Sequence, residues 1–268
     1  MYYAMYVVGF ALMMILNVFC YGKYNTTRKR AVIYTLVTYV YGVLGAIAMG
    51  ILYTNISKAH HVEEESRVAI FGAVVFTPLL LMATVAVEKI IVRRTAQKTD
   101  NSRGKKKTKT PPPVSMRNTV DLLTPGIFII LTCAKLGCHF SGCCYGVACE
   151  WGVHSVKAGE GTVFPVQLFE VGTMCAILLL CYYIKRTEFF RRGMAYPLTA
   201  AIYSAARFGW EFKRYYPEEL RRLVFGLTFW QATCCVVFAA SVISLIVLHM
   251  TQPSAPLKTT RNGKHKLK

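Results

Sequence analysis

The sequence predicts an all-α integral membrane protein with seven transmembrane helices. Three observations support this fold class. Of the 268 residues, 54% are hydrophobic. The apolar residues gather in blocks long enough to cross about 30 Å of hydrocarbon, which takes roughly 20 helical residues. Lysine and arginine are concentrated in every second connection between these blocks, as is typical of a chain that crosses a membrane repeatedly.

Seven apolar segments are expected to span the membrane. The first begins at Met1 but lacks the basic start and the small-residue cleavage site of a signal peptide, so we interpret it as a span. Pro125 and Gly126 interrupt the fourth segment and Arg207 lies in the sixth, which weakens the hydropathy of both. In chain order the segments are approximately Met1–Tyr21, Ala31–Thr54, Ala69–Ala86, Val120–Ala134, Val166–Ile184, Met194–Trp210 and Phe225–Met250.

The basic residues predict the orientation. The connections after the first, third, fifth and seventh segments hold 23 of the 32 Lys and Arg residues. By the positive-inside rule these connections are cytoplasmic, which places the N-terminus outside and the C-terminus in the cytoplasm. Glu63, Glu64 and Glu65 lie between the second and third segments, which fits the outer side. The net charge of +19 is then explained by basic cytoplasmic connections that lie near anionic lipid headgroups. No nucleic-acid partner is expected.

We expect a single polytopic membrane domain over residues 1–268. The connection at about 95–113 combines Lys105–Lys107 with Pro111–Pro113 and has almost no apolar residues, so it is predicted to be a disordered cytoplasmic loop. A second basic segment is the tail at 251–268. No GxGxxG, Walker A, HExxH or GxSxG sequence occurs, so nucleotide-driven transport and the common hydrolase mechanisms have no local support, and no cofactor is expected.

The end of the fourth segment, AKLGCHFSGCCYG, combines a lysine with glycines, a histidine and cysteines. Polar groups in this position of a membrane protein usually mark a functional site. We expect the helix to end near Ala134, so that Lys135 lies close to the bilayer surface. Gly137 and Gly146 would then let the following backbone turn tightly and approach a ligand.

The cysteines after this segment leave several interpretations open. With His139 and His154 they offer soft ligands for zinc, but their spacing lacks the paired C-x2-C of well-defined zinc sites. Outside the membrane the thiols would pair as disulfides in an oxidising compartment or stay free. We expect structural cysteines, free or disulfide-bonded, in preference to a metal site or a catalytic thiol, and no metal is expected. The residues are Cys138, Cys143, Cys144 and Cys149.

The sixth segment, AIYSAARFGWEFKR, carries a second polar group. Tyr203, Arg207 and Glu211 recur every four residues and share one helical face, with Arg214 nearby. An arginine at membrane depth costs about 2.5–3.5 kcal/mol unless it faces the protein interior and meets an anion or water. Arg207 either pairs with Glu211 for stability or faces a ligand. A basic residue four positions before an acidic one is the less favourable order for a helical ion pair, so we favour a ligand as the partner of Arg207. A lipid phosphate suits this role, because the guanidinium can form two parallel hydrogen bonds to it.

A third element, FPVQLFE, opens the fifth segment. Pro165 suits the first turn of a helix. Gln167 and Glu170 are three residues apart, so both can face inward. Glu170 is then buried, either in a structural hydrogen bond to a neighbouring helix or in direct contact with a substrate.

In their order and spacing these elements resemble the prolipoprotein diacylglyceryl transferases of bacterial inner membranes. The family signature Gly-Arg-x-Gly-Asn-Phe-x-Asn-x-Glu-x-x-Gly corresponds to residues 134–146. Gly137 and Gly146 match it strictly, and Lys135 keeps the positive charge of its arginine.

Three later family elements also have counterparts in this chain. Pro-x-Gln-Leu-Tyr-Glu is similar to residues 165–170, and Tyr-x-x-x-Arg-x-x-x-Glu-Phe-x-Arg is matched by residues 203–214. A final Gly-x-Thr-x-x-Gln resembles residues 226–231, which end at Gln231. The resemblance therefore covers most of the chain after residue 119.

The resemblance implies a multi-pass protein of the bacterial inner (plasma) membrane and a transfer reaction. The diacylglyceryl group of phosphatidylglycerol would pass to the lipobox cysteine in the signal peptide of a preprolipoprotein, forming a thioether and releasing glycerol phosphate. The implied partners are phosphatidylglycerol, preprolipoprotein signal peptides and membrane lipid. The implied catalytic residues are Lys135, Tyr203, Arg207 and Glu211, and the implied substrate-binding residues are Gly137, Gly146, Gln167, Glu170, Arg214 and Gln231.

Arg207, with Lys135 or Arg214, would neutralise the phosphate as charge moves onto the departing glycerol phosphate. Glu211 would hold Arg207 in position, and Tyr203 would donate a hydrogen bond to a phosphate or glycerol oxygen.

Departures from the family pattern keep other functions open. The family has a histidine followed by two glycines in its third span, where this chain has Phe71, Gly72 and Ala73. Cys138, Ser141 and Cys143 replace the asparagines and the glutamate of the signature, and His139 is the candidate proton acceptor nearest in sequence. The alternatives are an altered mechanism, another acceptor, or a lipid-binding homologue without turnover. A transporter or channel with an intramembrane Arg/Glu site is also open.

Overall fold

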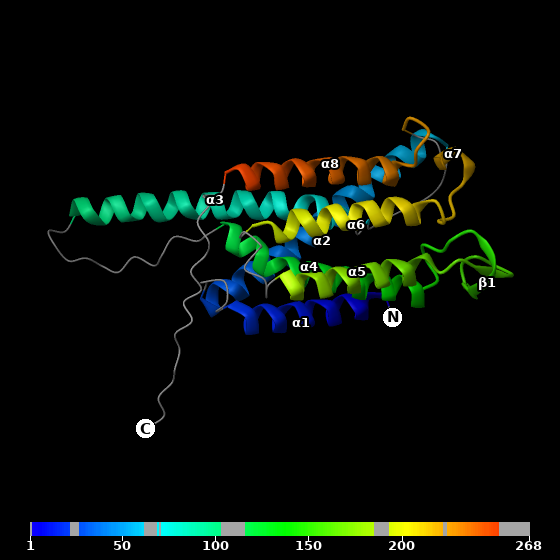
Figure 1. Ribbon diagram of the computed structural model, residues 1–268, viewed down its shortest axis with the longest axis horizontal. Helices are drawn as coiled ribbons and strands as arrows, with labels where there is room; N and C mark the ends of the chain where they lie inside the picture. Colours follow the sequence, from blue (N-terminus) through cyan, green and yellow to red (C-terminus); the bar gives the residue numbers. More distant parts are fainter. Residues whose placement is uncertain are drawn as a thin grey trace, which may run out of the picture.

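Long α-helices that run side by side form most of the protein (Figure 1). The structure is a computed structural model that describes residues 2–21, 27–61, 69, 71–102, 116–184, 193–221 and 224–251. The helices are α1 (Tyr2–Cys20), α2 (Arg28–Ala59), α3 (Phe71–Ser102), α4 (Met116–Phe140), α5 (Val166–Ile184), α6 (Ala195–Glu211), α7 (Glu218–Arg221) and α8 (Phe229–Met250).

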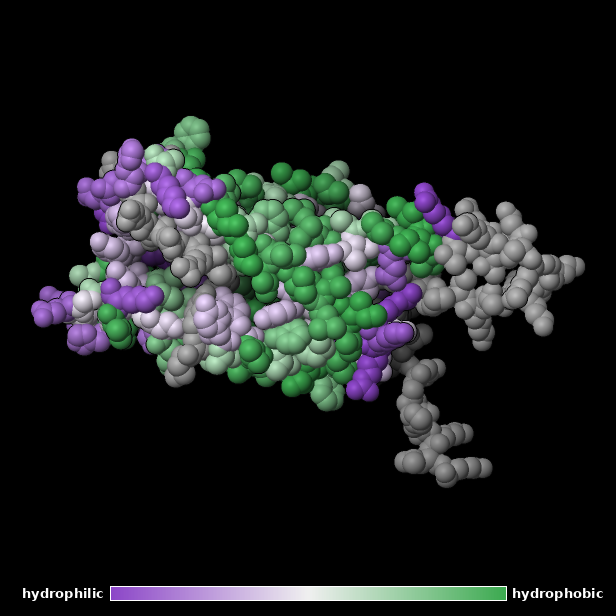
Figure 2. Space-filling model, turned by 180° about the vertical axis from the view of Figure 1, so that it is seen from behind, coloured by the Kyte–Doolittle hydropathy of each residue, from purple (hydrophilic) through white to green (hydrophobic). Residues whose placement is uncertain are grey.

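Six helices in the described part of the chain are long and apolar enough to cross a membrane, namely α1, α2, α3, α4, α5 and α8. The α6 helix, with 17 residues, is shorter than these. Figure 2 shows hydrophobic residues across the middle of one face of the molecule, between two more hydrophilic ends. The exposed residues include leucine, isoleucine and valine side chains, which suit a surface in contact with hydrocarbon. The described part of the chain is therefore mostly helical and has the apolar helices of a multi-pass membrane protein.

Two predicted boundaries are wrong because helices continue past the apolar residues. The α3 helix extends to Ser102, so residues 95–102, expected in a disordered loop, are helical. After Pro78 the chain contains no further proline or glycine before Gly104, which permits this extension. The rest of the predicted loop, 103–113, and of the predicted tail, 252–268, lies outside the described residues.

The α4 helix corrects the second boundary. It continues through Lys135 to Phe140, not to a surface turn near Ala134, and Gly137 is a helical residue. Most of α4 is buried, since it packs against both α1 and α5. A helix enclosed by other helices needs no apolar face toward lipid, which explains both its weak hydropathy and its tolerance of polar residues.

A short β-hairpin follows α4, and sequence patterning did not predict it. Strands β1 (Ala148–His154) and β2 (Thr162–Val163) pair antiparallel. The hairpin lies at the same end of the helices as α7 (Figure 1). We call this end of the molecule, which carries β1 and β2, the hairpin end.

One buried carboxylate fixes α6 against α4 at the opposite end. Asp121 in α4 accepts hydrogen bonds from the backbone N–H groups of Gly193, at 2.5 Å, and Ala195, at 3.2 Å. These N–H groups lie at the start of α6, where helical donors have no intrahelical partner. Asp121 thus caps α6 from a neighbouring helix and sets how far α6 extends toward the hairpin end.

Candidate functional site

Charged residues from four segments meet inside the protein near the hairpin end. We call them the ion cluster. Each is at most 7% exposed. Among the described residues, the one other buried Asp, Glu, Lys or Arg is Asp121. The cluster consists of Lys135 of α4, Glu170 of α5, Arg207 and Glu211 of α6, and Arg214 just after α6.

Glu170 contacts all three cations of the ion cluster. Its Oε2 lies 2.5 Å from Nζ of Lys135. Its Oε1 accepts from Nη1 of Arg207 and, at 3.0 Å, from Nη2 of Arg214. Of the two roles left open for this residue, the interhelical one is therefore present, and Glu170 joins α5 to α4, to α6 and to the segment after α6.

Glu211 forms the second anionic centre. Its Oε2 lies 3.3 Å from Nη2 of Arg207, so the ion pair that the four-residue spacing left open for Arg207 is present. The same oxygen is 3.7 Å from Nε of Arg214, and Oε1 accepts from the hydroxyl of Tyr216. Burial and the nearby Glu211 carboxylate raise the pKa of Tyr216 well above its usual value, which keeps it a neutral donor. No motif in the sequence pointed to Tyr216.

The ion cluster contains three basic side chains and two carboxylates, so basic groups outnumber acidic groups by one. Among the described residues, the Nε–H groups of Arg207 and Arg214 have no hydrogen-bond acceptor, although Nε of Arg214 lies 3.7 Å from Oε2 of Glu211. Oε2 of Glu170 and of Glu211 likewise has no hydrogen-bond donor there apart from its ion-pair partners. A buried donor without a partner costs about 1–3 kcal/mol. The excess of basic groups and the unpaired Nε–H groups favour an anion that would supply acceptor oxygens and negative charge.

Gly146 controls the position of Arg214. The two residues form an isolated antiparallel bridge, and the Gly146 N–H donates to the Phe164 carbonyl at 3.0 Å. A Cβ atom at Gly146 would lie 2.6 Å from the carbonyl oxygens of both Lys213 and Phe164. Only glycine lets the backbone at residue 146 come this close to the two carbonyl oxygens. Gly146 therefore affects the site by fixing the backbone of Arg214.

Aromatic rings form one wall of the ion cluster. The Cζ atom of Arg207 lies 5.7 Å from the centroid of the Phe71 ring, within the range of a cation–π contact. Phe71 also stacks on Tyr203, which is fully buried and packs edge-on against Phe128. Phe71 occupies the sequence position of the histidine in the resemblance, so an apolar ring faces Arg207 at that position.

The remaining predicted residues lie beside the ion cluster or outside it. Gln167 donates from Nε2 to the backbone carbonyl of Cys143 at 2.6 Å. Gly137 is buried within α4. Gln231 forms a capping box at the start of α8, where its Oε1 accepts from the Thr228 N–H at 3.0 Å. The amide of Gln231 is therefore engaged in a helix cap.

Three of the four cysteines between residues 138 and 149 come together at the C-terminal end of α4, where Cys138 lies. The sulfur atoms of Cys138, Cys143 and Cys144 all lie within 4.8 Å of one another. All ten cysteines of the chain are free thiols. The pKa of the Cys144 thiol lies well below its usual value, because the Cys138 and Cys143 thiols donate hydrogen bonds to it and Arg214 and Lys135 are near.

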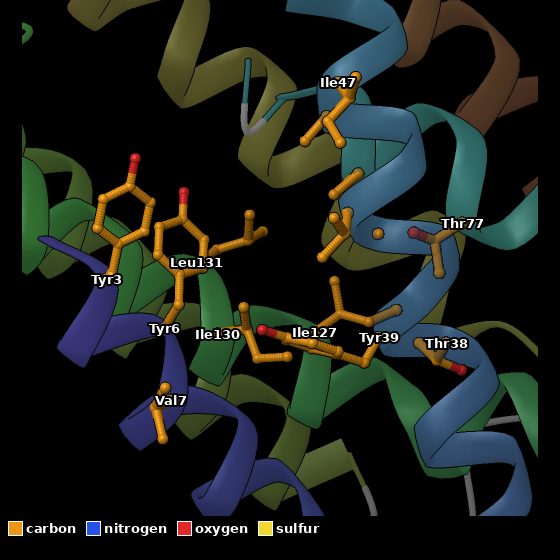
Figure 3. A pocket seen from close by; sticks show the side chains of 14 residues that line it. Tyr3, Tyr6, Val7, Thr38, Tyr39, Ile47, Thr77, Ile127, Ile130 and Leu131 are labelled. Carbon is orange, nitrogen blue, oxygen red and sulfur yellow. The ribbon is translucent and has the colours of Figure 1, made fainter. Parts of the chain in front are cut away.

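An apolar cavity of about 330 Å³ lies among α1, α2, α3 and α4. Figure 3 shows Tyr3 and Tyr6 of α1 on one side and Ile47 of α2 on the other. Leu131 of α4 also lines the cavity, one helical turn before Lys135. The cavity is therefore a space for an apolar group within one turn of the ion cluster.

Comparison with known protein families gives one match. A family model described as prolipoprotein diacylglyceryl transferase matches residues 105–247, more than half of the chain. The matched range includes every residue of the ion cluster, the three clustered thiols and the hairpin. No curated protein matches the chain.

Proposed function

Because the chain belongs to the prolipoprotein diacylglyceryl transferase family, we propose that it transfers the diacylglyceryl group of phosphatidylglycerol to the lipobox cysteine of a preprolipoprotein. The acceptor sulfur forms a bond to the terminal glyceryl carbon. The bond from that carbon to the phosphate oxygen breaks, and glycerol phosphate leaves. The acceptor thiol loses its proton in the process.

The excess of basic over acidic side chains in the ion cluster is the observation that carries this proposal. A phosphodiester has one negative charge, which matches the excess. The leaving glycerol phosphate gains a second charge as the carbon–oxygen bond breaks. Buried cations that stand in place before the reaction stabilise such a developing charge without reorganisation.

We assign the residues as follows. Arg207 binds the phosphate with two parallel hydrogen bonds, and Lys135 and Arg214 add charge from other directions. Glu211 and Glu170 hold these cations in place. Tyr203 donates to a phosphate or glycerol oxygen.

Four further residues shape the site around the donor lipid. Gly146 and Gln167 fix the backbone beside Arg214 and Cys143, while Gly137 and Gln231 support the helices on either side. One acyl chain enters the apolar cavity lined by Leu131, and the other stays in the bilayer.

The proposed setting is the bacterial inner membrane. The α6 helix serves as the seventh span, because it lies between α5 and α8 in the chain and has nearly the length of α5. The whole chain forms one membrane domain. The hairpin end faces outward, so the N-terminus is outside and the C-terminus is cytoplasmic, as the basic connections favour.

Purified protein supplied with labelled phosphatidylglycerol and a lipobox peptide tests the proposal. The peptide cysteine should gain the mass of one diacylglyceryl group, and a peptide with serine in its place should not. Bound phosphatidylglycerol with no gain in peptide mass would contradict transfer and indicate a lipid-binding homologue.

A further inference from the structure

The thiols of Cys138, Cys143 and Cys144 have no role in the assignments above. We propose that they bind one Zn²⁺ ion, and that the fourth coordination position of this ion takes the thiolate of the acceptor cysteine. The zinc site rests on the geometry of the three sulfurs. The role of its fourth position rests on the proposed function.

The three sulfurs are already near the spacing that zinc requires. At a Zn–S distance of about 2.3 Å, tetrahedral geometry places sulfur ligands about 3.8 Å apart. The sulfur atoms here lie within 4.8 Å of one another, so shifts of about 1 Å or less, within the reach of side-chain torsions, complete the site. Three thiolates form a soft ligand set of the kind that selects zinc over magnesium or calcium.

The backbone holds the thiols in this arrangement without a metal. The Cys143 N–H donates to the Cys138 carbonyl at 3.1 Å, which folds the chain back over the end of α4. Gln167 holds the Cys143 carbonyl from α5, and Ser155 donates to the Gly142 carbonyl at 2.8 Å. Cys144 adopts a left-handed backbone conformation, with φ of 59°, that aims its side chain at the other two.

The burial of the ligands leaves one side of the site open. Cys138 is 2% exposed, Cys143 is half-buried and Cys144 is exposed. A zinc ion bound here would be covered on the Cys138 side and reachable past the half-buried Cys143. Three protein ligands with an open fourth position are typical of a catalytic zinc site, whereas a structural site is closed by four.

The site also stands next to the phosphate-binding residues. Two residues after Cys144, Gly146 bridges to Arg214. Gln167, which holds Cys143, is one helical turn before Glu170. A thiolate in the fourth position would thus approach a diacylglyceryl carbon whose phosphate lies among Lys135 and Arg214.

Zinc would promote the deprotonation that the acceptor thiol needs at this site. Phe71 provides no proton acceptor beside Arg207. A thiol that coordinates a zinc ion is deprotonated, and its proton passes to water on the open side. The thiolate then forms the carbon–sulfur bond as glycerol phosphate leaves with the electrons of the carbon–oxygen bond, so the reaction needs no oxidant or reductant.

Metal content tests the site independently of activity. The full chain, purified in detergent, incubated with Zn²⁺ and freed of unbound ions, should retain one zinc per chain by elemental analysis. Cys143→Ser and Cys138→Ser should lose it, while the matched control Cys149→Ser should keep it. A wild-type protein without zinc, or one two mass units lighter per chain through a disulfide among these cysteines, would overturn the proposal.

A second measurement tests the fourth position. Co²⁺ in place of zinc should show sulfur-to-cobalt charge-transfer absorption, and a lipobox peptide should increase it by adding a fourth sulfur. A peptide with serine at the acceptor position should leave the spectrum unchanged. Transfer that continues at the wild-type rate in Cys143→Ser, or a spectrum that does not respond to the cysteine peptide, would overturn the acceptor role and leave the transferase function standing. Zinc binding without any transfer would contradict the proposed function alone.

Discussion

Lys135 in α4 and Glu170 in α5 form a buried ion pair, with 2.5 Å between Nζ and Oε2 and at most 4% exposure of either side chain. Glu170 also binds Arg207 and Arg214, so one carboxylate connects cations from three segments. The consequence is that the geometry of the whole ion cluster depends on Glu170. Its removal leaves Lys135 without a carboxylate partner among the described residues, and leaves Arg207 and Arg214 with Glu211 as their remaining carboxylate.

Glu170→Gln should therefore be strongly destabilising. Breaking a buried ion pair by removing one partner costs about 3–5 kcal/mol in the free energy of unfolding. Thermal melting in detergent should show a large decrease, together with a lower yield of folded protein in the membrane. Glu150→Gln, an exposed carboxylate in β1, is the matched control and should melt like the wild type. Equal melting temperatures for the two variants would contradict the central role of Glu170.

Gly146→Ala should displace Arg214 and reduce transfer. The added methyl group would lie 2.6 Å from two backbone carbonyl oxygens, so the bridge to Arg214 must open. We expect both the melting temperature and the transfer rate to fall. Gly172→Ala in α5 has open space around its Cβ position and should be neutral or slightly stabilising, because alanine favours a helix by about 0.5–1 kcal/mol over glycine. A Gly146→Ala protein that transfers normally would show that Arg214 is positioned by other contacts.

Asp121→Ala should lower the stability of the protein and leave the rate of diacylglyceryl transfer unchanged. It removes two hydrogen bonds at the start of α6, and the loss of a cap typically costs about 0.5–2 kcal/mol. The melting temperature should fall, while the transfer rate per folded molecule, measured below the melting range, should stay near that of the wild type. A rate that collapses in fully folded protein would place Asp121 in the reaction and contradict a capping role.

The orientation can be checked with a reporter that is active only outside the cytoplasm. Inserted at Glu160, an exposed residue between the hairpin strands, it should be active, and fused after Lys268 it should be silent. The reason is that the basic connections anchor the opposite end in the cytoplasm. Activity of the fusion after Lys268 would overturn the proposed topology.

The sequence predicted the helices well where hydropathy alone decides them. The predicted fifth span coincides with α5, and the first, second, sixth and last spans overlap α1, α2, α6 and α8. The end of α4 was missed because helix–helix packing, which covers Lys135, leaves no local signal. The end of α3 was missed because a helix can continue into a polar segment that contains no breaker.

In the site, too, relationships within one helix could be predicted from the sequence, whereas contacts between helices could not. The spacing of Arg207 and Glu211 predicted that they share one helical face, since it is set within one helix, and their ion pair was the less favoured of the two roles considered for Arg207. The closer link from Arg207 to Glu170 joins two helices, and periodicity within a helix cannot reveal which neighbour it faces. For the same reason Tyr216 and the approach of three cysteine sulfurs were not predicted.

The transfer rate of Arg207→Lys tests the central claim most directly. Lysine keeps the charge but loses the bidentate fork that would bind the phosphate in the transition state. We expect folded protein at the wild-type level and a rate of diacylglyceryl transfer to the lipobox peptide that is lower by about 10²–10³-fold, the usual cost of removing one such donor. Arg30→Lys, which changes an arginine paired with Glu88 outside the ion cluster, should transfer at the wild-type rate. A well-folded Arg207→Lys protein that also transfers at that rate would contradict the assignment of Arg207 to the phosphate.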